Sequence, residues 1–231
     1  MRGAEPGGSL YVIARAPCPG EVKTRLARAI GDGPATRLYA AFLQDLGHRF
    51  ASGPFRPRWY VTPAEGWPAI ATLLPSGGAW VVREQPEGSL TDRQRHLFRE
   101  AVANGESPVV LIASDSPQLE VSVVSRAFEL LRRHDLVLGP TLDGGYYLIG
   151  MRGWHDVLAG ATMGHADALT QVRERASALG LETALLPATF DVDEIEDLAR
   201  LVAAARGRPD LAATRAALAE LDLEEELAAL A

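Results

Sequence analysis

The sequence predicts a single-domain α/β fold in which a doubly wound, mainly parallel sheet carries helices on both faces. Short apolar runs alternate along the chain with longer amphipathic segments. Most of the apolar runs are continuous, which is typical of strands that are covered on both sides. The alternation of such strands with helices favours parallel pairing, because a helical crossover returns the chain to the same edge of the sheet.

Seven apolar runs and several amphipathic segments carry this prediction. The predicted strands are residues 10–14, 59–61, 79–82, 109–113, 136–138, 146–149 and 184–186. The predicted helices are residues 35–50, 90–104, 121–134 and 166–179, and two more begin after Lys23 and from Ile195. Residues 1–209 form the predicted domain, and leucines among acidic residues predict an amphipathic C-terminal helix over residues 210–231. We expect this helix to pack on its own domain, with a partner subunit of a homodimer as the alternative.

The composition excludes several classes of protein. The chain has 231 residues and a formal net charge of −7, from 23 basic and 30 acidic side chains. This acidic balance argues against a nucleic-acid partner, since binding to a phosphate backbone requires clustered basic residues. The one cysteine, Cys18, permits no internal disulfide, and the first apolar run is too short for a signal peptide or a membrane span. We therefore expect a cytoplasmic protein without a membrane partner.

The loop after the first predicted strand concentrates basic residues. It places Arg15, Lys23 and Arg25 around the start of a helix, and Lys23 is the only lysine of the chain. Backbone N–H groups at a helix N-terminus, together with an ammonium and guanidinium groups, favour phosphate binding. The alternative is a solvated basic helix start. Because the solitary lysine lies in this loop, we predict that Lys23 faces a phosphate across from Asp115.

A carboxylate follows the predicted strand at residues 109–113. Asp115 lies between Ser114 and Ser116, in a loop at the edge where open parallel sheets bind their ligands. Oxygen ligands at this position suit a divalent cation such as Mg²⁺. The alternative is that Asp115 caps the helix that begins near Glu120. Metal binding is the favoured interpretation, because functional residues concentrate in loops on rigid scaffolds.

A glycine pair lies between the apolar runs at residues 136–138 and 146–149. The segment Asp143-Gly144-Gly145 indicates a tight turn, because Asp-Gly is a strong hairpin signal. Paired glycines also let a backbone approach a ligand closely, and Asp143 would then face that ligand. The turn and the site are compatible interpretations.

Two more carboxylates follow the last predicted strand. Asp191 and Asp193 share one face of an extended segment, so either could complete a two-carboxylate magnesium site with Asp115. The alternative is N-capping of the helix from Ile195, where acidic residues stabilise the positive end of the helix dipole. We expect one of the two to cap this helix and the other to bind metal.

Four segments of the chain resemble a bacterial protein family. They are Ala14-Arg15-Ala16-Pro17 with Gly20 and Lys23-Thr24-Arg25-Leu26, then Ser114-Asp115-Ser116-Pro117-Gln118-Leu119, residues 138–150, and residues 191–198. The family was long catalogued as a domain of unknown function and is named an arsenosugar-biosynthesis or selenodomain-associated glycosyltransferase. Its members are similar to the nucleotide-diphospho-sugar transferase (GT-A) superfamily. The resemblance covers residues 10–201 and implies a GT-A-like, Rossmann-like fold.

The resemblance implies a role for each matching position. It implies that the loop around Lys23 holds nucleotide phosphates, that Asp115 is the metal aspartate, and that Asp193, or else Asp191, is the second one. The catalytic candidates are Lys23, Asp115 and Asp143; the nucleotide-binding candidates are Ala14, Arg15, Pro17, Gly20, Lys23, Thr24, Arg25, Ser114, Gly144 and Gly145; the candidate ligands for Mg²⁺ or Mn²⁺ are Asp115, Asp193 and Asp191. The chain departs from the family pattern at residues 85–93 and 162–165, so acceptor recognition transfers least.

Two reactions fit these residues. In the first, which the family name favours, an acceptor attacks the sugar carbon of an NDP-sugar and NDP leaves. In the alternative, a phosphorylated small molecule attacks the α-phosphorus of an NTP and pyrophosphate leaves. The loop from Lys23 to Leu26 is similar to that of the 2-phospholactate guanylyltransferases, which supports this guanylyl or cytidylyl transfer. A non-catalytic nucleotide-binding protein is the third reading, and in either reaction we expect a small-molecule acceptor.

Overall fold

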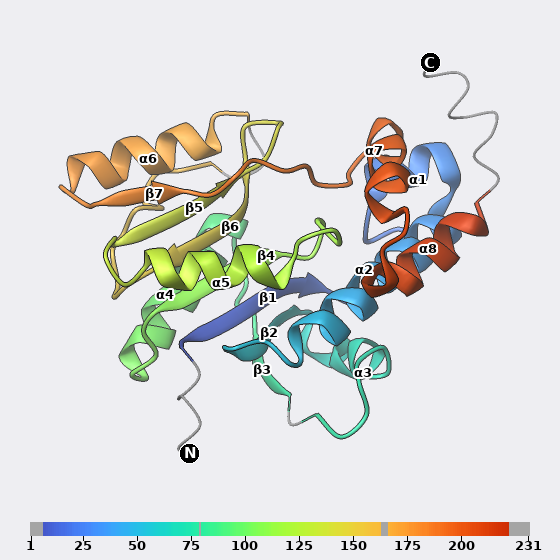
Figure 1. Cartoon of the computed structure of the whole chain (residues 1–231), viewed down its shortest axis with the longest axis horizontal. Coiled ribbons are helices and arrows are strands. Elements are labelled where there is room, and N and C mark those ends of the chain that lie inside the picture. Colours follow the sequence, from blue (N-terminus) through green and yellow to red (C-terminus); the bar gives the residue numbers. More distant parts are fainter. Residues whose placement is uncertain (1–6, 79, 163–165, 222–231) are drawn as a thin grey trace.

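The structure, a computed structural model, describes residues 7–78, 80–162 and 166–221, and these form one seven-stranded mixed sheet (Figure 1). The strands are β1 (Ser9–Arg15), β2 (Arg56–Thr62), β3 (Val81–Glu84), β4 (Val109–Ala113), β5 (Leu136–Pro140), β6 (Tyr146–Met151) and β7 (Thr183–Leu185). Their order across the sheet is β3-β2-β1-β4-β6-β5-β7. All seven predicted strands are therefore present, and the α/β prediction is confirmed.

Helices cover both faces of the sheet. Those among the described residues are α1 (Thr24–Ile30), α2 (Asp32–Phe50), α3 (Trp67–Ala71), α4 (Leu90–Ala103), α5 (Val121–Leu130), α6 (Ala168–Ala178), α7 (Ile195–Ala205) and α8 (Ala212–Ala219). On β1, Leu10 and Val12 pack with α2, α5 and α7, whereas Tyr11 packs with α4 and α6. Because side chains of a strand alternate between its two faces, this division shows that the sheet is buried on both sides.

The sheet changes its direction of winding at β1. β1 pairs in parallel with β2 on one side and with β4 on the other, and β2 pairs with β3. The chain winds from β1 through β2 to β3 toward one edge and then returns to β4 on the other side of β1, which opens a crevice at the carboxyl ends of β1 and β4. Ligands of open α/β sheets bind at such a switch point, so the fold places the candidate loops where the sequence predicts them.

One strand runs against the others. β6 is antiparallel to both β4 and β5, and the turn at residues 141–145 joins it to β5. The hairpin signal at Asp143 and Gly144 therefore indicates the local structure correctly. Gly144 has a φ of +93°, and a Cβ there would lie 1.9 Å from the backbone oxygen of Ala166. Its close approach is to the chain's own backbone, which differs from the predicted approach to a ligand.

The described part of the C-terminal segment packs on its own domain. α8 lies along α2, and the carboxylate of Asp45 on α2 accepts hydrogen bonds from the backbone N–H groups of Ala213 (3.0 Å) and Thr214 (2.8 Å). Figure 1 shows α8 beside α1, α2 and α7 at one end of the molecule. This contact accounts for residues 212–219 of the predicted C-terminal helix, and residues 222–231 lie outside the described residues.

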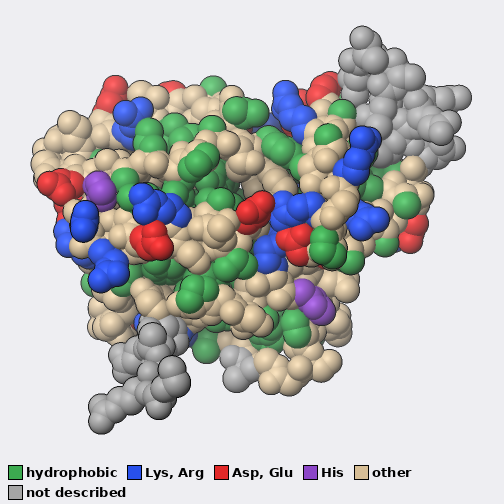
Figure 2. All heavy atoms as spheres, in the orientation of Figure 1, with side chains coloured by type: hydrophobic (Ala, Val, Ile, Leu, Met, Phe, Trp, Pro, Cys, Tyr) green, Lys and Arg blue, Asp and Glu red, His purple; other side chains and the backbone are tan. Residues whose placement is uncertain are grey.

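Charges of both signs are mixed on the surface. On the face seen in Figure 2, basic and acidic side chains are interspersed and do not form a continuous basic patch. None of the helices within the described ranges combines the length and the apolar character that a bilayer crossing requires.

Candidate active site

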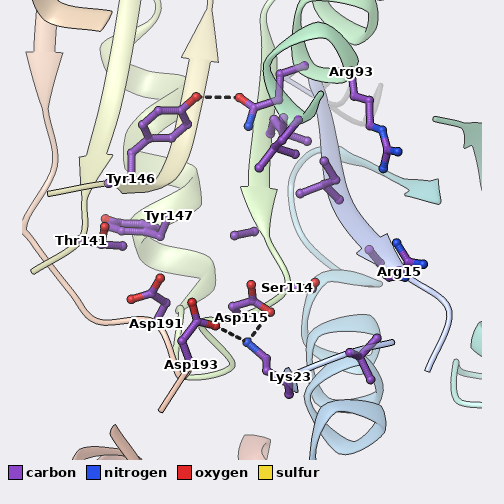
Figure 3. Close-up of a pocket in the computed structure, with 18 of the residues that line it drawn as sticks. Arg15, Lys23, Arg93, Ser114, Asp115, Thr141, Tyr146, Tyr147, Asp191 and Asp193 are labelled. Carbon is purple, nitrogen blue, oxygen red and sulfur yellow. Dashed lines mark hydrogen bonds and ion pairs between the residues drawn. The ribbon is translucent and has the colours of Figure 1, made fainter. Parts of the chain in front are cut away.

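A pocket of about 540 Å³ opens at the carboxyl ends of β1 and β4, within the volume range of small-molecule sites (Figure 3). Most residues predicted for the site line it: Ala14, Arg15, Lys23, Thr24, Arg25, Ser114, Asp115, Asp143, Gly145, Asp191 and Asp193. Three others do not. Pro17 and Gly20 belong to the loop after β1, and Gly144 belongs to the β5–β6 turn. The structure thus brings together loops that are far apart in the sequence.

Lys23 lies between two carboxylates in this pocket. Its Nζ is 2.7 Å from Oδ1 of Asp115 and 3.0 Å from Oδ1 of Asp193, and its side chain is only 4% exposed. Burial alone lowers the pKa of Lys23, but the two carboxylates outweigh burial and raise that pKa above its ordinary value. The ammonium group therefore stays charged. The predicted position across from Asp115 becomes a direct ion pair, and phosphate contact stays a prediction.

The backbone of Lys23 has an unusual conformation. Lys23 is the N-cap of α1 and has a φ of +48°, the one positive value at a non-glycine position among the described residues. The left-handed region is sparsely occupied by residues with a Cβ, and such strain concentrates at functional sites. Here it accompanies a side chain that points inward to Asp115 and Asp193, as Figure 3 shows. The sequence offers no signal for this conformation.

The three aspartates meet because the C-terminal segment is bound to the loop after β4. The backbone N–H of Val192 donates to the carbonyl of Asp115 at 3.0 Å, and the hydroxyl of Ser116 donates to the carbonyl of Phe190 at 3.0 Å. These bonds place Asp191 and Asp193 beside Asp115, on the inner side of the pocket. The shared face that the sequence predicts for the two residues is thus the face that lines the pocket.

The helix-capping alternatives are wrong for all three aspartates. Glu120 is the N-cap of α5, so Asp115 is free of that role. Glu194 is the N-cap of α7, and the carboxylate of Asp197 accepts hydrogen bonds from the backbone N–H groups of Asp193 and Glu194, both at 3.0 Å. The expectation that one of Asp191 and Asp193 caps this helix fails, because the caps lie further along the chain.

Acidic groups outnumber the ammonium they surround. Burial, and then the charges of Asp143 and Asp193, raise the pKa of Asp191 to about 6. No three of the described acidic, histidine and cysteine side chains converge as a ready metal cage. Two carboxylates that already hold one cation still fit Mg²⁺ or Mn²⁺, since Mg²⁺ typically binds one or two carboxylates and completes its shell with water and substrate phosphates.

Asp143 combines the two roles that the sequence leaves open. Its Oδ1 accepts hydrogen bonds from the hydroxyl of Thr141 and from the backbone N–H of Gly145 at 3.1 Å, which closes the turn. Asp143 also lines the pocket and contributes to the raised pKa of Asp191. The turn therefore fixes a carboxylate at the edge of the site.

Several residues that line the pocket were not predicted from the sequence as site residues. The hydroxyl of Tyr39 on α2 accepts from the backbone N–H of Arg15 at 3.1 Å and lies 3.0 Å from Oγ of Ser114. Burial, and then the charge of Asp115, raise the pKa of Tyr39 to about 12. Gln85, Arg93, Gln94, Thr141, Tyr146 and Tyr147 also line the pocket. Gln85 directly follows β3, so the rule that located Asp115 would have indicated it, whereas Tyr39 occupies an ordinary apolar position of an amphipathic helix.

Comparisons with known proteins place these features in a family. Residues 46–165 match the model of a family described as an uncharacterized protein conserved in bacteria (DUF2064). The chain is 34% identical over 196 residues, 80% of its length and 86% of the relative's, to a 3-phospho-D-glycerate guanylyltransferase of Phenylobacterium zucineum (strain HLK1). The family match therefore covers just over half of the chain, and the likeness to the relative extends over most of both chains.

Solved structures show the same fold. One from Desulfovibrio desulfuricans G20, provisionally named a nucleotide-diphospho-sugar transferase, superposes with a TM-score of 0.83 at 29% identity and covers 93% of this chain and 97% of that one. A cytidylyltransferase from Leptospira borgpetersenii has a TM-score of 0.52 at 13% identity, over 88% and 95% of the two chains, a likeness of fold alone. The names of these relatives agree with the predicted transferase class. The chain belongs to the DUF2064 family and has a nucleotide-diphospho-sugar transferase-like fold.

Proposed function

We propose that the protein is a metal-dependent nucleotidyltransferase that transfers NMP from an NTP to a phosphorylated small molecule. The observation that carries the proposal is the pairing of the buried Lys23 ammonium with the partly exposed Asp115 and Asp193, at the switch point of a chain 34% identical to a guanylyltransferase. The sequence favours glycosyl transfer first, and the curated relative supports the alternative better. GTP and 3-phospho-D-glycerate, which that relative's name implies, are the first substrates to test.

The residues at this end of the pocket suit the handling of phosphates. A phosphate oxygen of the acceptor attacks the α-phosphorus, the bond from this phosphorus to the bridging oxygen breaks, and pyrophosphate leaves with its electrons. Negative charge grows on the leaving oxygens. Arg15, Lys23 and Arg25 all line the pocket and can pair with these oxygens, which stabilises the transition state more than the ground state.

Asp115 and Asp193 would hold the divalent ion, with Asp191 beside them. When bound, such an ion acts as a Lewis acid and neutralises charge on the phosphates. The two carboxylates are paired with the Lys23 ammonium, so an ion on them frees Lys23 for a phosphate. Lys23 thereby connects the two halves of the proposed site, the carboxylates and the nucleotide.

Glycosyl transfer from an NDP-sugar is the second candidate. It is favoured by the Desulfovibrio structure, whose name is that of a nucleotide-diphospho-sugar transferase and whose fold matches over nearly the whole chain. The finer label of the sequence resemblance, arsenosugar biosynthesis, would belong to this candidate. Both reactions need a diphosphate that is held by a carboxylate-bound cation and by basic side chains. The site residues therefore suit either reaction, and only the products discriminate between them.

The products can be measured directly. The protein is incubated with Mg²⁺ or Mn²⁺, each NTP and 3-phospho-D-glycerate, and pyrophosphate is followed; parallel reactions with NDP-sugars are followed for free NDP. We expect acceptor-dependent pyrophosphate release. NDP release from a sugar donor without pyrophosphate from any NTP would replace the proposal with glycosyl transfer, and tight nucleotide binding without either product would indicate a non-catalytic nucleotide-binding protein.

A further inference from the structure

Arg93 differs from the other basic residues that line the pocket. Arg15 pairs with Glu21 at 2.9 Å, Lys23 with Asp115 at 2.7 Å, and Arg25 with Glu194 at 3.7 Å. No acidic partner of Arg93 occurs among residues 7–78, 80–162 and 166–221, and its Nε is buried without a hydrogen-bond acceptor there. Because Nε is buried, a molecule in the pocket would meet Nη1 and Nη2, whose hydrogens form one planar edge of the guanidinium.

The position of Arg93 is fixed from two sides. Its backbone carbonyl accepts a hydrogen bond from the hydroxyl of Tyr60 at 2.8 Å, and its Nη1 approaches Oε1 of Gln85 at 3.4 Å. Gln85 is itself held, because its Nε2 donates to the carbonyls of Ala14 at 3.0 Å and Tyr60 at 2.7 Å. With both amide hydrogens in use, the oxygen of Gln85 faces Arg93. The guanidinium is therefore pre-organised and not a freely mobile surface charge.

The location of Arg93 suits the base of a nucleotide. Figure 3 shows Arg93 at the opposite end of the pocket from Lys23, Asp115 and Asp193, with Arg15 between the two ends. If phosphates lie at the Lys23 end, as in the proposed function, the nucleoside extends toward Arg93. Leu90, one helical turn before Arg93 on α4, is 45% exposed and lines the pocket, which provides an apolar surface for a base.

We propose that Arg93, oriented by Gln85, recognises the donor base as guanine through its O6 and N7 acceptors. A guanidinium carries donors only, in a planar fork, and this fork matches two adjacent acceptors on one edge of the ring. Adenine presents a donor in place of O6, so it leaves one Arg93 hydrogen unpaired. The inference rests on the proposed function for the placement of the phosphates and extends it to base specificity.

The experiment measures nucleotide affinity by calorimetry without any acceptor. Wild-type protein with Mg²⁺ is expected to bind GTP roughly tenfold to a hundredfold more tightly than ATP. It is also expected to bind 7-deaza-GTP, which lacks N7, several-fold more weakly than GTP. Because the analogue arm needs no variant, it tests the proposal even if substitutions at Arg93 destabilise the fold. Equal affinities for all three nucleotides would overturn the inference.

Variants separate base recognition from simple charge. Arg93→Gln is expected to bring GTP down to the affinity of ATP. Arg93→Lys is expected to keep only part of the preference for GTP, because lysine keeps the charge but loses the planar fork. Arg25→Gln is the matched control at the phosphate end, and it should weaken GTP and ATP equally. Retained discrimination in Arg93→Gln would overturn the inference, because base selectivity would then lie elsewhere in the pocket. A selective loss of 3-phospho-D-glycerate affinity in Arg93→Gln would also overturn it, and would show that Arg93 binds an anionic group of the acceptor.

The outcomes also separate this inference from the proposed reaction. GTP binding that depends on Arg93, without pyrophosphate release, would keep base recognition and remove nucleotidyl transfer. Acceptor-dependent pyrophosphate release at equal rates from GTP and ATP would keep the reaction and remove the role of Arg93.

Discussion

Two charge clusters of this molecule, each built around a buried charged group, have opposite balances. In the Lys23 cluster, one ammonium pairs with Asp115 and Asp193, while Asp143 and Asp191 add further negative charge. In the Glu106 cluster, one carboxylate accepts hydrogen bonds from the hydroxyl of Tyr11 at 3.0 Å and from Arg83 at 2.6 Å, and it forms an ion pair with Arg58 at 3.1 Å. The Lys23 cluster has more acidic than basic groups, whereas in the Glu106 cluster both carboxylate oxygens have partners.

The difference indicates what each cluster is for. Glu106 is 8% exposed and Tyr11 is fully buried, with the guanidinium groups of Arg58 and Arg83 within 6 Å of its ring. A carboxylate surrounded by donors is complete without a ligand and ties β1, β2 and β3 to the start of β4. The Lys23 cluster has carboxylate charge left over, so a bound cation lowers its energy. We expect substitutions in the Lys23 cluster to affect function and substitutions in the Glu106 cluster to affect stability.

Asp115→Asn should produce the largest effect of all, on the reaction rate. Loss of one carboxylate weakens the hold on the divalent ion and on Lys23, and kcat/KM should fall about a hundredfold to a thousandfold. Stability should change little, because Asp193 still pairs with Lys23 and the remaining acids repel each other less. Pyrophosphate release and urea denaturation measure the two quantities. Full activity in this variant would remove Asp115 from the site.

Glu106→Gln should reverse this pattern. The substitution removes the charge that compensates Arg58 and Arg83, and breaking one partner of a buried ion pair costs about 3 kcal/mol or more of the free energy of unfolding. The folded fraction should keep its activity at 25 °C. Glu100→Gln on α4, where the side chain is 45% exposed, is the control and should change stability by less than about 0.5 kcal/mol. Lost activity at unchanged stability would end the distinction between the clusters.

Lys23→Met tests whether the ammonium and a divalent ion compete for the same carboxylates. Without the ammonium, nucleotide-free protein should bind Mg²⁺ or Mn²⁺ at least about tenfold more tightly, since a unit charge at about 4 Å contributes up to about 4 kcal/mol at a protein surface. Calorimetric titration with the metal alone measures this change. The double variant with Asp115→Asn should lose the gain. An unchanged metal affinity would place the ion elsewhere.

The fold could be predicted further than the site. Continuous apolar runs located all seven strands. In the central strands β1, β4, β5 and β6, burial on both faces leaves little freedom of residue type. The direction of β6 depends on a turn, and Asp143 with Gly144 indicated that turn. α3 was missed, since five residues carry too short a pattern for helical periodicity.

The site could be predicted only by the edge of the sheet that it occupies. Asp115, Asp191 and Asp193 follow strands, and parallel strands end at a common edge, so their meeting follows from topology. The ion pair of Lys23 with Asp193 joins residues 170 positions apart. It also accompanies a left-handed backbone conformation at Lys23, which no sequence pattern indicates. Tyr39 and Arg93 belong to helices whose sequence indicates only amphipathicity. Their roles appear once the helices are packed.

A third cluster, around the partly exposed Asp210, should give the smallest effect and completes the comparison. Asp210 is 38% exposed and pairs with Arg208 at 2.6 Å and Arg49 at 2.8 Å, and these arginines, Arg208 first, hold the pKa of Asp210 well below its ordinary value. Because the pKa of Asp210 is lower in the folded than in the unfolded protein, its ionised carboxylate stabilises the fold at pH values above the ordinary pKa. This stabilisation is lost as the pH falls toward and through the lowered pKa. Asp210→Asn should therefore cost about 1 kcal/mol or less at pH 7 after solvent screening, and the difference from wild type should shrink below about pH 4. Urea denaturation between pH 7 and pH 3 measures the free energy of unfolding of both proteins. Glu129→Gln is the control, because Glu129 pairs with Arg126 at the exposed surface, and it should show neither the cost nor its pH dependence. A cost as large as that of Glu106→Gln would mean that exposure does not separate these clusters.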